Sequence, residues 1–294
     1  MSALTWVSRG LATPSAQDHI ACMTHAETGS RRPTFFAHGA SGRAAGEVLV
    51  LDEDESRHVR ALRLDQGARI RLTDGCGSLW EGRLVAGGRS ATCVLDSRSI
   101  PAAALPVELA FGVGNKAHLM WLVEKATEMG VSRLVPLESE RTRSVADAGR
   151  SPAFWSKAER RAISAMKQSG GAWLPEMEPP CSLDGYIERN AGPIGGGERG
   201  MAQRVRLDGS GEGLRSLIEP WGGEDLLGML VGPEGGWSDG EVALLDGAGF
   251  RPASLGSLVL RFETAGIAGL AVVAQHVLDR AGTGDVPPSK DAGG

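Results

Sequence analysis

The spacing of apolar residues changes once along this chain of 294 residues, and that change constrains the fold more than any other feature. Before residue 101, short apolar runs bounded by Gly or Asp recur roughly every 10–12 residues, which is typical of a small β-barrel. After residue 106, strand patterns and helix patterns alternate, which is typical of an α/β domain with a mainly parallel sheet. The segment 101–106 (PAAALP) therefore marks a linker between two domains.

These patterns and the composition of the two ends divide the chain into four parts. We expect a disordered extension over residues 1–30, a β-rich domain over 31–103, an α/β domain over 107–281 and a disordered tail over 282–294. The extension contains acidic residues and no unbroken apolar run, so it is not typical of a signal peptide. No stretch of the chain reaches the roughly 18 consecutive apolar residues that indicate a membrane span.

Charge is distributed unevenly between the two domains. The whole chain has a net charge of −5, but residues 31–100 contain eleven Arg, no Lys and nine acidic residues, a net charge of +2. Local patches rather than totals decide whether a protein binds nucleic acid. The four Cys form no CxxC pair and the six His form no HxH or HExxH motif, so we expect unpaired thiols in a reducing cytoplasm and no metal site.

Within the second domain the helix signals are clear. Helices are predicted over 116–129, stopped by Gly130, and over 153–168, stopped by Gly170. A Gly-rich loop is predicted over 192–213, and strands over 226–231 and 253–260. A long apolar helix is predicted over 264–281, and its nearly unbroken apolar run requires burial on most sides.

The first chemically informative segment is Leu230–Ser238 (LVGPEGGWS), in which a buried strand ends in a glycine-rich loop. Ser238 starts a capping box (Ser-x-x-Glu), so a helix follows the loop. Ligands bind at this point of open α/β sheets, and glycines such as Gly232 and Gly235 let the backbone approach a ligand closely. The loop matches neither the P-loop nor the GxGxxG motif, and Glu234 would repel a pyrophosphate. It suits a ligand with an amine, a sulfonium and an adenine edge; the alternative is a tight turn that binds nothing.

The second segment is Ser254–Gly266 (SLGSLVLRFETAG), which places Arg261 and Glu263 between an apolar strand and the long helix. Thr264 is suited to cap that helix. The alternative to a role in chemistry is an ion pair between Arg261 and Glu263 that fixes the start of the helix.

Together the two segments resemble one family. GPEGG-x-S-x-x-E followed by LG-x-x-x-LR-x-ETA is similar to the C-terminal signature of the RsmE family, the 16S ribosomal RNA (uracil-N3)-methyltransferases of the SPOUT superfamily. The resemblance extends upstream through RPTFF, DESRHVRALRL, KATEMGV, SER and QSG, and covers about residues 32–280.

The resemblance implies a fold and a cofactor. It implies a SPOUT-type α/β domain whose C-terminal segment forms a trefoil knot, preceded by a PUA-like β-barrel, and a homodimer. It implies S-adenosyl-L-methionine bound by the two loops 230–235 and 255–260. The implied cofactor-binding residues are Leu230, Val231, Gly232, Pro233, Glu234, Gly235, Leu255, Gly256 and Leu260.

The implied activity is methylation of N3 of a specific uridine in 16S ribosomal RNA of the small ribosomal subunit, in the cytoplasm. The uridine N3 must lose its proton, which a carboxylate can accept while an arginine stabilises the developing charge. The candidates are Arg261 and Glu263, with Glu234 third. Arginine grips phosphates and stacks on bases, so the expected RNA-binding residues are Arg32, Arg60, Arg63, Lys116 and Arg141.

Three departures from the family pattern keep alternatives open. Leu258 replaces an arginine, Phe262 a small residue, and Gly171 an arginine after Gln168-Ser169-Gly170. One alternative is a SPOUT methyltransferase with another RNA target, and the other is a non-catalytic RNA-binding assembly factor. A further alternative concerns two arginines, since Arg60 and Arg63 could serve only as ion-pair partners of Asp54 and Glu55.

Overall fold

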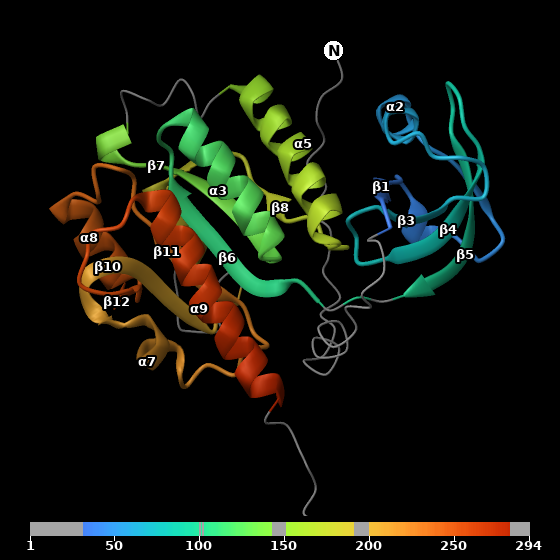
Figure 1. Cartoon of the computed structure of the whole chain (residues 1–294). Coiled ribbons are helices and arrows are strands. Elements are labelled where there is room, and N and C mark those ends of the chain that lie inside the picture. Colours follow the sequence, from blue (N-terminus) through green and yellow to red (C-terminus); the bar gives the residue numbers. More distant parts are fainter. Residues whose placement is uncertain (1–31, 100, 102, 143–150, 191–199, 283–294) are drawn as a thin grey trace, which may run out of the picture.

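The computed structural model describes residues 32–99, 101, 103–142, 151–190 and 200–282, which form two domains (Figure 1). The predicted extension over 1–30 lies outside the described residues, and so does the predicted tail over 282–294 apart from Gly282, which ends a helix.

The N-terminal domain is built on one five-stranded sheet. Its strands are β1 (Thr34–Phe36), β2 (Val48–Val50), β3 (Arg69–Thr73), β4 (Leu79–Ala86) and β5 (Thr92–Ser99), in the spatial order β1-β3-β4-β5-β2. The pairs are antiparallel except for β1 with β3. Helix α2 (Glu53–Ala61) begins at Asp52, whose side chain accepts a hydrogen bond from the Glu55 amide, and a 3₁₀ turn η1 (Ala40–Gly42) follows β1. The sheet and α2 enclose a core that includes Phe35, Val59 and Trp80.

The second domain contains a parallel sheet of seven strands. They are β6 (Leu105–Gly112), β7 (Val131–Glu138), β8 (Glu176–Met177), β9 (Cys181–Ser182), β10 (Gln203–Gly213), β11 (Leu227–Val231) and β12 (Arg251–Ser254). The spatial order is β12-β10-β11-β6-β7-β8, and β9 also pairs with β7. Every pair is parallel, so the carboxyl ends of the strands share one edge. This arrangement confirms the expected α/β class.

Helices cover both faces of this sheet, which makes three layers (Figure 1). One face is covered by α3 (Lys116–Glu128), α5 (Pro152–Ser169), α7 (Leu214–Ile218) and α9 (Phe262–Gly282), and the other by α6 (Leu183–Asn190) and α8 (Asp239–Gly247). A short 3₁₀ turn, η2 (Glu140–Thr142), follows β7. With both faces covered, a central strand such as β11 is buried along its whole length.

Three expectations about local structure were wrong. The predicted Gly-rich loop contains strand β10. Its sequence lacks the apolar pattern of a buried strand, because two of its buried positions are Arg204 and Arg206. The Arg206 guanidinium lies in the strand because Asp246 and Asp208 neutralise it. The predicted strand over 253–260 ends at Ser254. Helix α9 begins at Phe262, so Thr264 lies within the first turn and is not its cap.

The two domains are joined by a backbone bridge. The Gly77 amide donates to the Ala172 carbonyl at 2.9 Å, and the Leu174 amide donates to the Gly75 carbonyl at 2.9 Å. Gly77 has a φ of +87°, and a Cβ there would lie 2.2 Å from the Trp173 ring, so this turn requires glycine.

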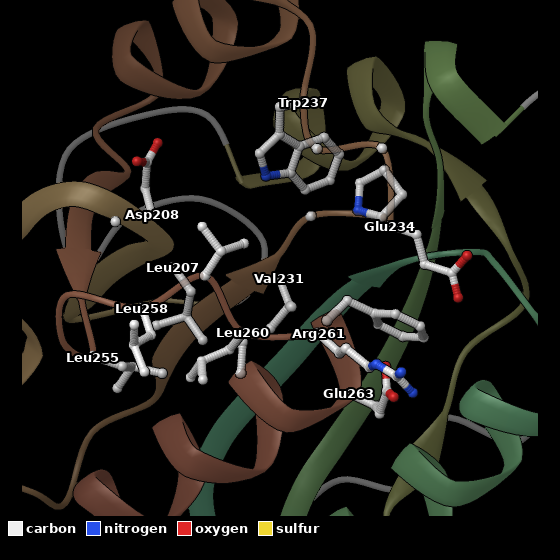
Figure 2. A pocket seen from close by; sticks show the side chains of 18 of the residues that line it. Leu207, Asp208, Val231, Glu234, Trp237, Leu255, Leu258, Leu260, Arg261 and Glu263 are labelled. Carbon is white, nitrogen blue, oxygen red and sulfur yellow. The ribbon is translucent and has the colours of Figure 1, made fainter.

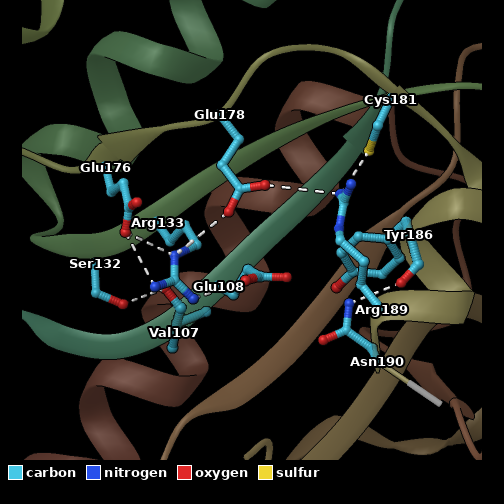
Figure 3. Close-up of polar contacts among 10 residues, drawn as sticks. All are labelled: Val107, Glu108, Ser132, Arg133, Glu176, Glu178, Cys181, Tyr186, Arg189 and Asn190. Atoms are coloured by element: carbon cyan, nitrogen blue, oxygen red, sulfur yellow. Dashed lines mark hydrogen bonds and ion pairs between the residues drawn. The ribbon is translucent and has the colours of Figure 1, made fainter. Parts of the chain in front are cut away.

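A network of ion pairs around Arg133 connects β6, β7 and β8 (Figure 3). Arg133 of β7 forms ion pairs with Glu108 of β6 at 3.2 Å, with Glu176 of β8 at 3.0 Å and with Glu178 at 3.7 Å. Burial opposes the charge on Arg133, but the carboxylates of Glu108 and Glu176 outweigh that effect and raise the pKa of the guanidinium. Arg133 therefore connects three neighbouring parts of the sheet.

Replacing Arg133 tests this connection. Arg133→Ala removes the guanidinium beside Glu108, a carboxylate that is fully buried, and uncompensated buried charge is strongly destabilising. We expect the free energy of unfolding of the second domain to fall by about 3 kcal/mol, measured by urea denaturation. Arg83→Ala breaks an exposed pair with Asp96 and is the control, with a much smaller expected loss. Equal losses in the two variants would contradict the account.

Candidate active site

A cavity of about 1030 Å³ opens at the carboxyl edge of the parallel sheet (Figure 2). It is lined by the loop after β11 (residues 232–237), the segment after β12 (255–263), the middle of β10 (207–209) and His118 of α3. Because β12, β10, β11 and β6 are adjacent parallel strands, the segments that follow β12, β11 and β6 meet at one place. The two sequence motifs, about twenty residues apart, thus form opposite walls of one cavity.

The loop after β11 comes very close to the end of β6. Phe111 pairs with Val231, so Gly112 lies beside the residues that follow β11. A Cβ at Gly112 would lie 2.6 Å from the Pro233 backbone nitrogen, so only glycine permits this approach.

Hydrogen bonds from two segments, the start of α8 and the η2 turn after β7, fix the loop after β11. The predicted capping box is present, with the Ser238 side chain accepting from the Glu241 amide and Glu241 accepting from the Ser238 amide at 2.7 Å. The second carboxylate oxygen of Glu241 accepts from the Glu140 amide at 2.8 Å. The Arg141 guanidinium donates to the Gly235 carbonyl at 2.6 Å. These hydrogen bonds hold the loop against the start of α8 and the segment after β7.

One end of the cavity is polar. The His118 imidazole forms a hydrogen bond through Nδ1 with Glu234 Oε1 at 2.8 Å, and Nδ1 lies 3.9 Å from Glu263 Oε2. Figure 2 shows Glu234, Arg261 and Glu263 at this end. The Glu263 side chain is 10% exposed, whereas Arg261 is exposed. No ion pair joins Arg261 to Glu263 among the described residues, so the alternative of a helix-fixing pair has no support.

The opposite end of the cavity is largely apolar, with Leu207, Leu255 and Leu258 around it and Asp208 beside it (Figure 2). Hydrogen bonds from the Ser210 amide and hydroxyl and from Arg206 lower the pKa of Asp208, so this carboxylate stays ionised. Leu258 is 82% exposed, so the segment after β12 leaves this end open to solvent.

Most of the predicted cofactor-binding residues line the cavity. They are Val231, Gly232, Pro233, Glu234, Gly235, Leu255, Gly256 and Leu260. Leu230 does not line it, because side chains alternate along β11 and Leu230 packs on the other face of the sheet with Tyr186 and Phe250. The three predicted catalytic residues, Arg261, Glu263 and Glu234, also line the cavity.

The predicted RNA-binding residues lie in different environments. Arg141 packs on the loop after β11, and Lys116 is exposed two residues before His118. Arg32 is paired with Glu81 at 2.6 Å, and the Arg60 guanidinium donates to the Gly88 carbonyl. Arg63 is exposed.

The alternative pairing of Arg60 and Arg63 with Asp54 and Glu55 is wrong. Asp54 pairs with Arg57, and Glu55 pairs with Lys167 of the other domain.

Among the cavity-lining residues to which sequence reasoning assigned no role are His118, Asp208 and Trp237. His118 carries no motif of its own, since it lies within an ordinary amphipathic helix pattern. Asp208 falls in the segment mistaken for a loop. Trp237 lies inside the first motif, and its ring meets the position that a Gly232 Cβ would occupy at 3.1 Å.

None of the helices in the described part of the chain is long and apolar enough to cross a membrane. Within the same ranges, no group of three His, Cys, Asp or Glu side chains is placed to hold a metal ion.

Comparison with known proteins agrees with this arrangement. Residues 101–274 match the RNA methyltransferase domain family, and residues 51–96 match the RNA methyltransferase PUA domain family. The chain is 30% identical to ribosomal RNA small subunit methyltransferase E of Synechocystis sp. over 220 residues, 73% of this chain and 68% of that protein. It is 28% identical to the protein of the same name from Mycobacterium tuberculosis over 231 residues, 78% of this chain and 86% of the other.

Solved structures share the fold. A probable rRNA-methyltransferase from Porphyromonas gingivalis, 28% identical, superposes with a TM-score of 0.64 over 85% of this chain and 98% of that one. Ribosomal RNA small subunit methyltransferase E from Neisseria gonorrhoeae, solved bound to S-adenosyl methionine, has a TM-score of 0.69 at 23% identity over 83% of this chain and 97% of that one. The PUA-like domain followed by an α/β domain is thereby confirmed, and the trefoil knot stays a prediction. The chain belongs to the RNA methyltransferase family that includes ribosomal RNA small subunit methyltransferase E.

Proposed function

We propose that this chain uses S-adenosyl-L-methionine to methylate N3 of one uridine in 16S ribosomal RNA of the small subunit, in the cytoplasm. The observation that carries the proposal is the cavity itself. Its two walls are the family's two signature segments, and a histidine and two carboxylates gather at one end.

The residues of the cavity fit this cofactor. Trp237 Nε1 and Glu263 Oε2 are buried, and within the described part of the chain neither has a hydrogen-bond partner. Buried polar atoms are nearly always hydrogen-bonded, so a donor and an acceptor at this site favour a ligand that carries both. S-adenosylmethionine has an ammonium, a carboxylate and an adenine edge, and its adenine ring suits the apolar end around Leu207 and Leu255.

When bound, S-adenosylmethionine supplies a methyl carbon attached to positively charged sulfur, which is a strong electrophile. The protein has to prepare the nucleophile, because a uridine N3 keeps its proton at neutral pH. We assign the negatively charged carboxylates of Glu263 and Glu234 to the removal of that proton. Arg261 is assigned to the developing charge on the uracil carbonyl oxygens. The target base has to leave its stack to reach these groups.

A homodimer completes the proposal. Leu270 and Val273 of α9 are buried against the sheet, but Ile267, Ala268 and Val272 are only partly covered and Ala271 is exposed. A second copy would cover this apolar surface.

The cofactor assignment is tested at Gly232. Gly232→Val places branched carbons against the Trp237 ring and the cavity, so we expect loss of measurable S-adenosylmethionine binding by calorimetry in a folded protein. Gly240→Ala is the control, because a Cβ there meets only Ser238 Oγ at 3.8 Å. Unchanged affinity in folded Gly232→Val would refute the assignment. Wild-type protein that binds RNA but not the cofactor would favour the assembly-factor alternative.

The RNA contact is tested with two exposed cations, Arg63 and Lys116, whose side chains have no ion pair with any described residue. RNA affinity falls with salt at a log–log slope of about −0.7 to −0.9 per phosphate contact. We expect the double variant Arg63→Ala with Lys116→Ala to flatten that slope by roughly one to two. Arg83→Ala, whose guanidinium is paired with Asp96, should leave the slope unchanged. If the double variant keeps the wild-type slope, these two cations are not the RNA contact.

The assembly is tested by light scattering. We expect twice the 30.7 kDa mass of one chain at micromolar concentration. Ala271→Glu introduces a charge on the uncovered side of α9 and should give monomers, whereas Ala61→Glu on α2 should not. A monomeric wild-type protein would contradict the proposed dimer.

A further inference from the structure

His118 stands at the polar end of the cavity and belongs to neither signature segment. We propose that His118, oriented by Glu234, is the general base that accepts the N3 proton of the uridine. This inference rests on the proposed function and assigns a step of it to a residue outside both motifs.

The orientation of the ring follows from its contact with Glu234. An ionised carboxylate only accepts hydrogen bonds, so Nδ1, 2.8 Å from Glu234 Oε1, carries the ring proton. The lone pair is then on Nε2, and no described residue forms a hydrogen bond with that atom. The imidazole is partly exposed at 34% and lines the cavity, so a substrate can reach it. A carboxylate that fixes the tautomer of a histidine base is the arrangement of hydrolase triads.

The surroundings stabilise the ring after it takes the proton. Glu234 comes from the loop after β11, and Glu263 Oε2 comes from α9 and lies 3.9 Å from Nδ1. Both carboxylates thus lie near Nδ1, where their negative charge attracts the positive charge of a protonated ring. The other charged groups nearby in the chain are Lys116 on α3 and Arg261 before α9, and the Phe262 ring lies 6.2 Å from the imidazole, centroid to centroid.

An imidazole is also the better chemical match for the task. A general base is most effective when it titrates near the working pH, and an imidazole ordinarily does so while a carboxylate does not. In the proposed step, the proton moves from N3 of the uridine to Nε2 of His118. The N3 electron pair forms the bond to the methyl carbon, and the bond between that carbon and sulfur breaks with its electron pair left on sulfur. Glu234 and Glu263 then hold the positive ring in place.

The test compares His118→Asn with wild type. Asparagine keeps a donor toward Glu234 and has no basic nitrogen, so we expect kcat to fall about 100-fold or more. S-adenosylmethionine affinity should stay within about twofold of wild type by calorimetry. The wild-type rate should fall on the acid side as His118 is protonated, and the variant should lack that limb. His38→Asn makes the same change at an exposed histidine of the first domain and should leave every readout unchanged.

A measurement without substrate gives a second readout. Nitrogen NMR of the ligand-free protein should show the His118 proton on Nδ1, and Glu234→Gln should let the two tautomers mix. A proton on Nε2 in wild type, or an unchanged rate and acid limb in His118→Asn, would overturn the inference while leaving the proposed function standing. Wild-type protein that binds the cofactor and methylates no uridine would overturn both.

Discussion

The site depends on the parallel pairing of β6 with β11 and on the glycine at which β6 ends. Neighbouring parallel strands end at the same edge of the sheet, so the segments that follow β6 and β11 lie side by side. This brings His118 at the start of α3 into contact with Glu234 in the loop after β11, although the two residues are 116 positions apart in the sequence. The absence of a side chain at Gly112 lets the Pro233 backbone pass where a Cβ would lie only 2.6 Å away. A larger residue at this position would separate the imidazole from its carboxylate.

Rigidity around this contact is what makes the arrangement useful for catalysis. Glu241, which is buried, accepts hydrogen bonds from the Ser238 and Glu140 amides, and Arg141 donates to the Gly235 carbonyl. The loop is therefore fixed from its own helix and from the segment after β7. Groups held in place before the reaction need no reorganisation during it, which is a large share of what an active site contributes. Arg141, expected to bind RNA, has a supporting contact here that its sequence position did not indicate.

The sequence predicted the features that depend on local patterns. The change of hydrophobic spacing predicted two domains, the Ser-x-x-Glu pattern predicted the capping box at Ser238, and the two motifs predicted most of the cavity wall. It failed where tertiary contacts override local pattern. Strand β10 was missed because Arg206 is charged, and its burial depends on an ion pair with Asp246 that the sequence pattern does not reveal. Leu230 was wrongly predicted to line the cavity, because side chains alternate along β11 and Leu230 points to the opposite face of the sheet. His118 could not be found at all, since its partner lies on a distant segment. Arg32 was predicted to bind RNA, but the sequence did not indicate its ion pair with Glu81.

We propose for this chain the methylation of N3 of a uridine in the small-subunit ribosomal RNA. Mass spectrometry of that RNA from a strain lacking the gene tests it most directly. We expect one 3-methyluridine to disappear from that RNA and to return when the wild-type chain is supplied. An unchanged content of 3-methyluridine, or loss of a methyl group from a ribose or another base, would contradict it.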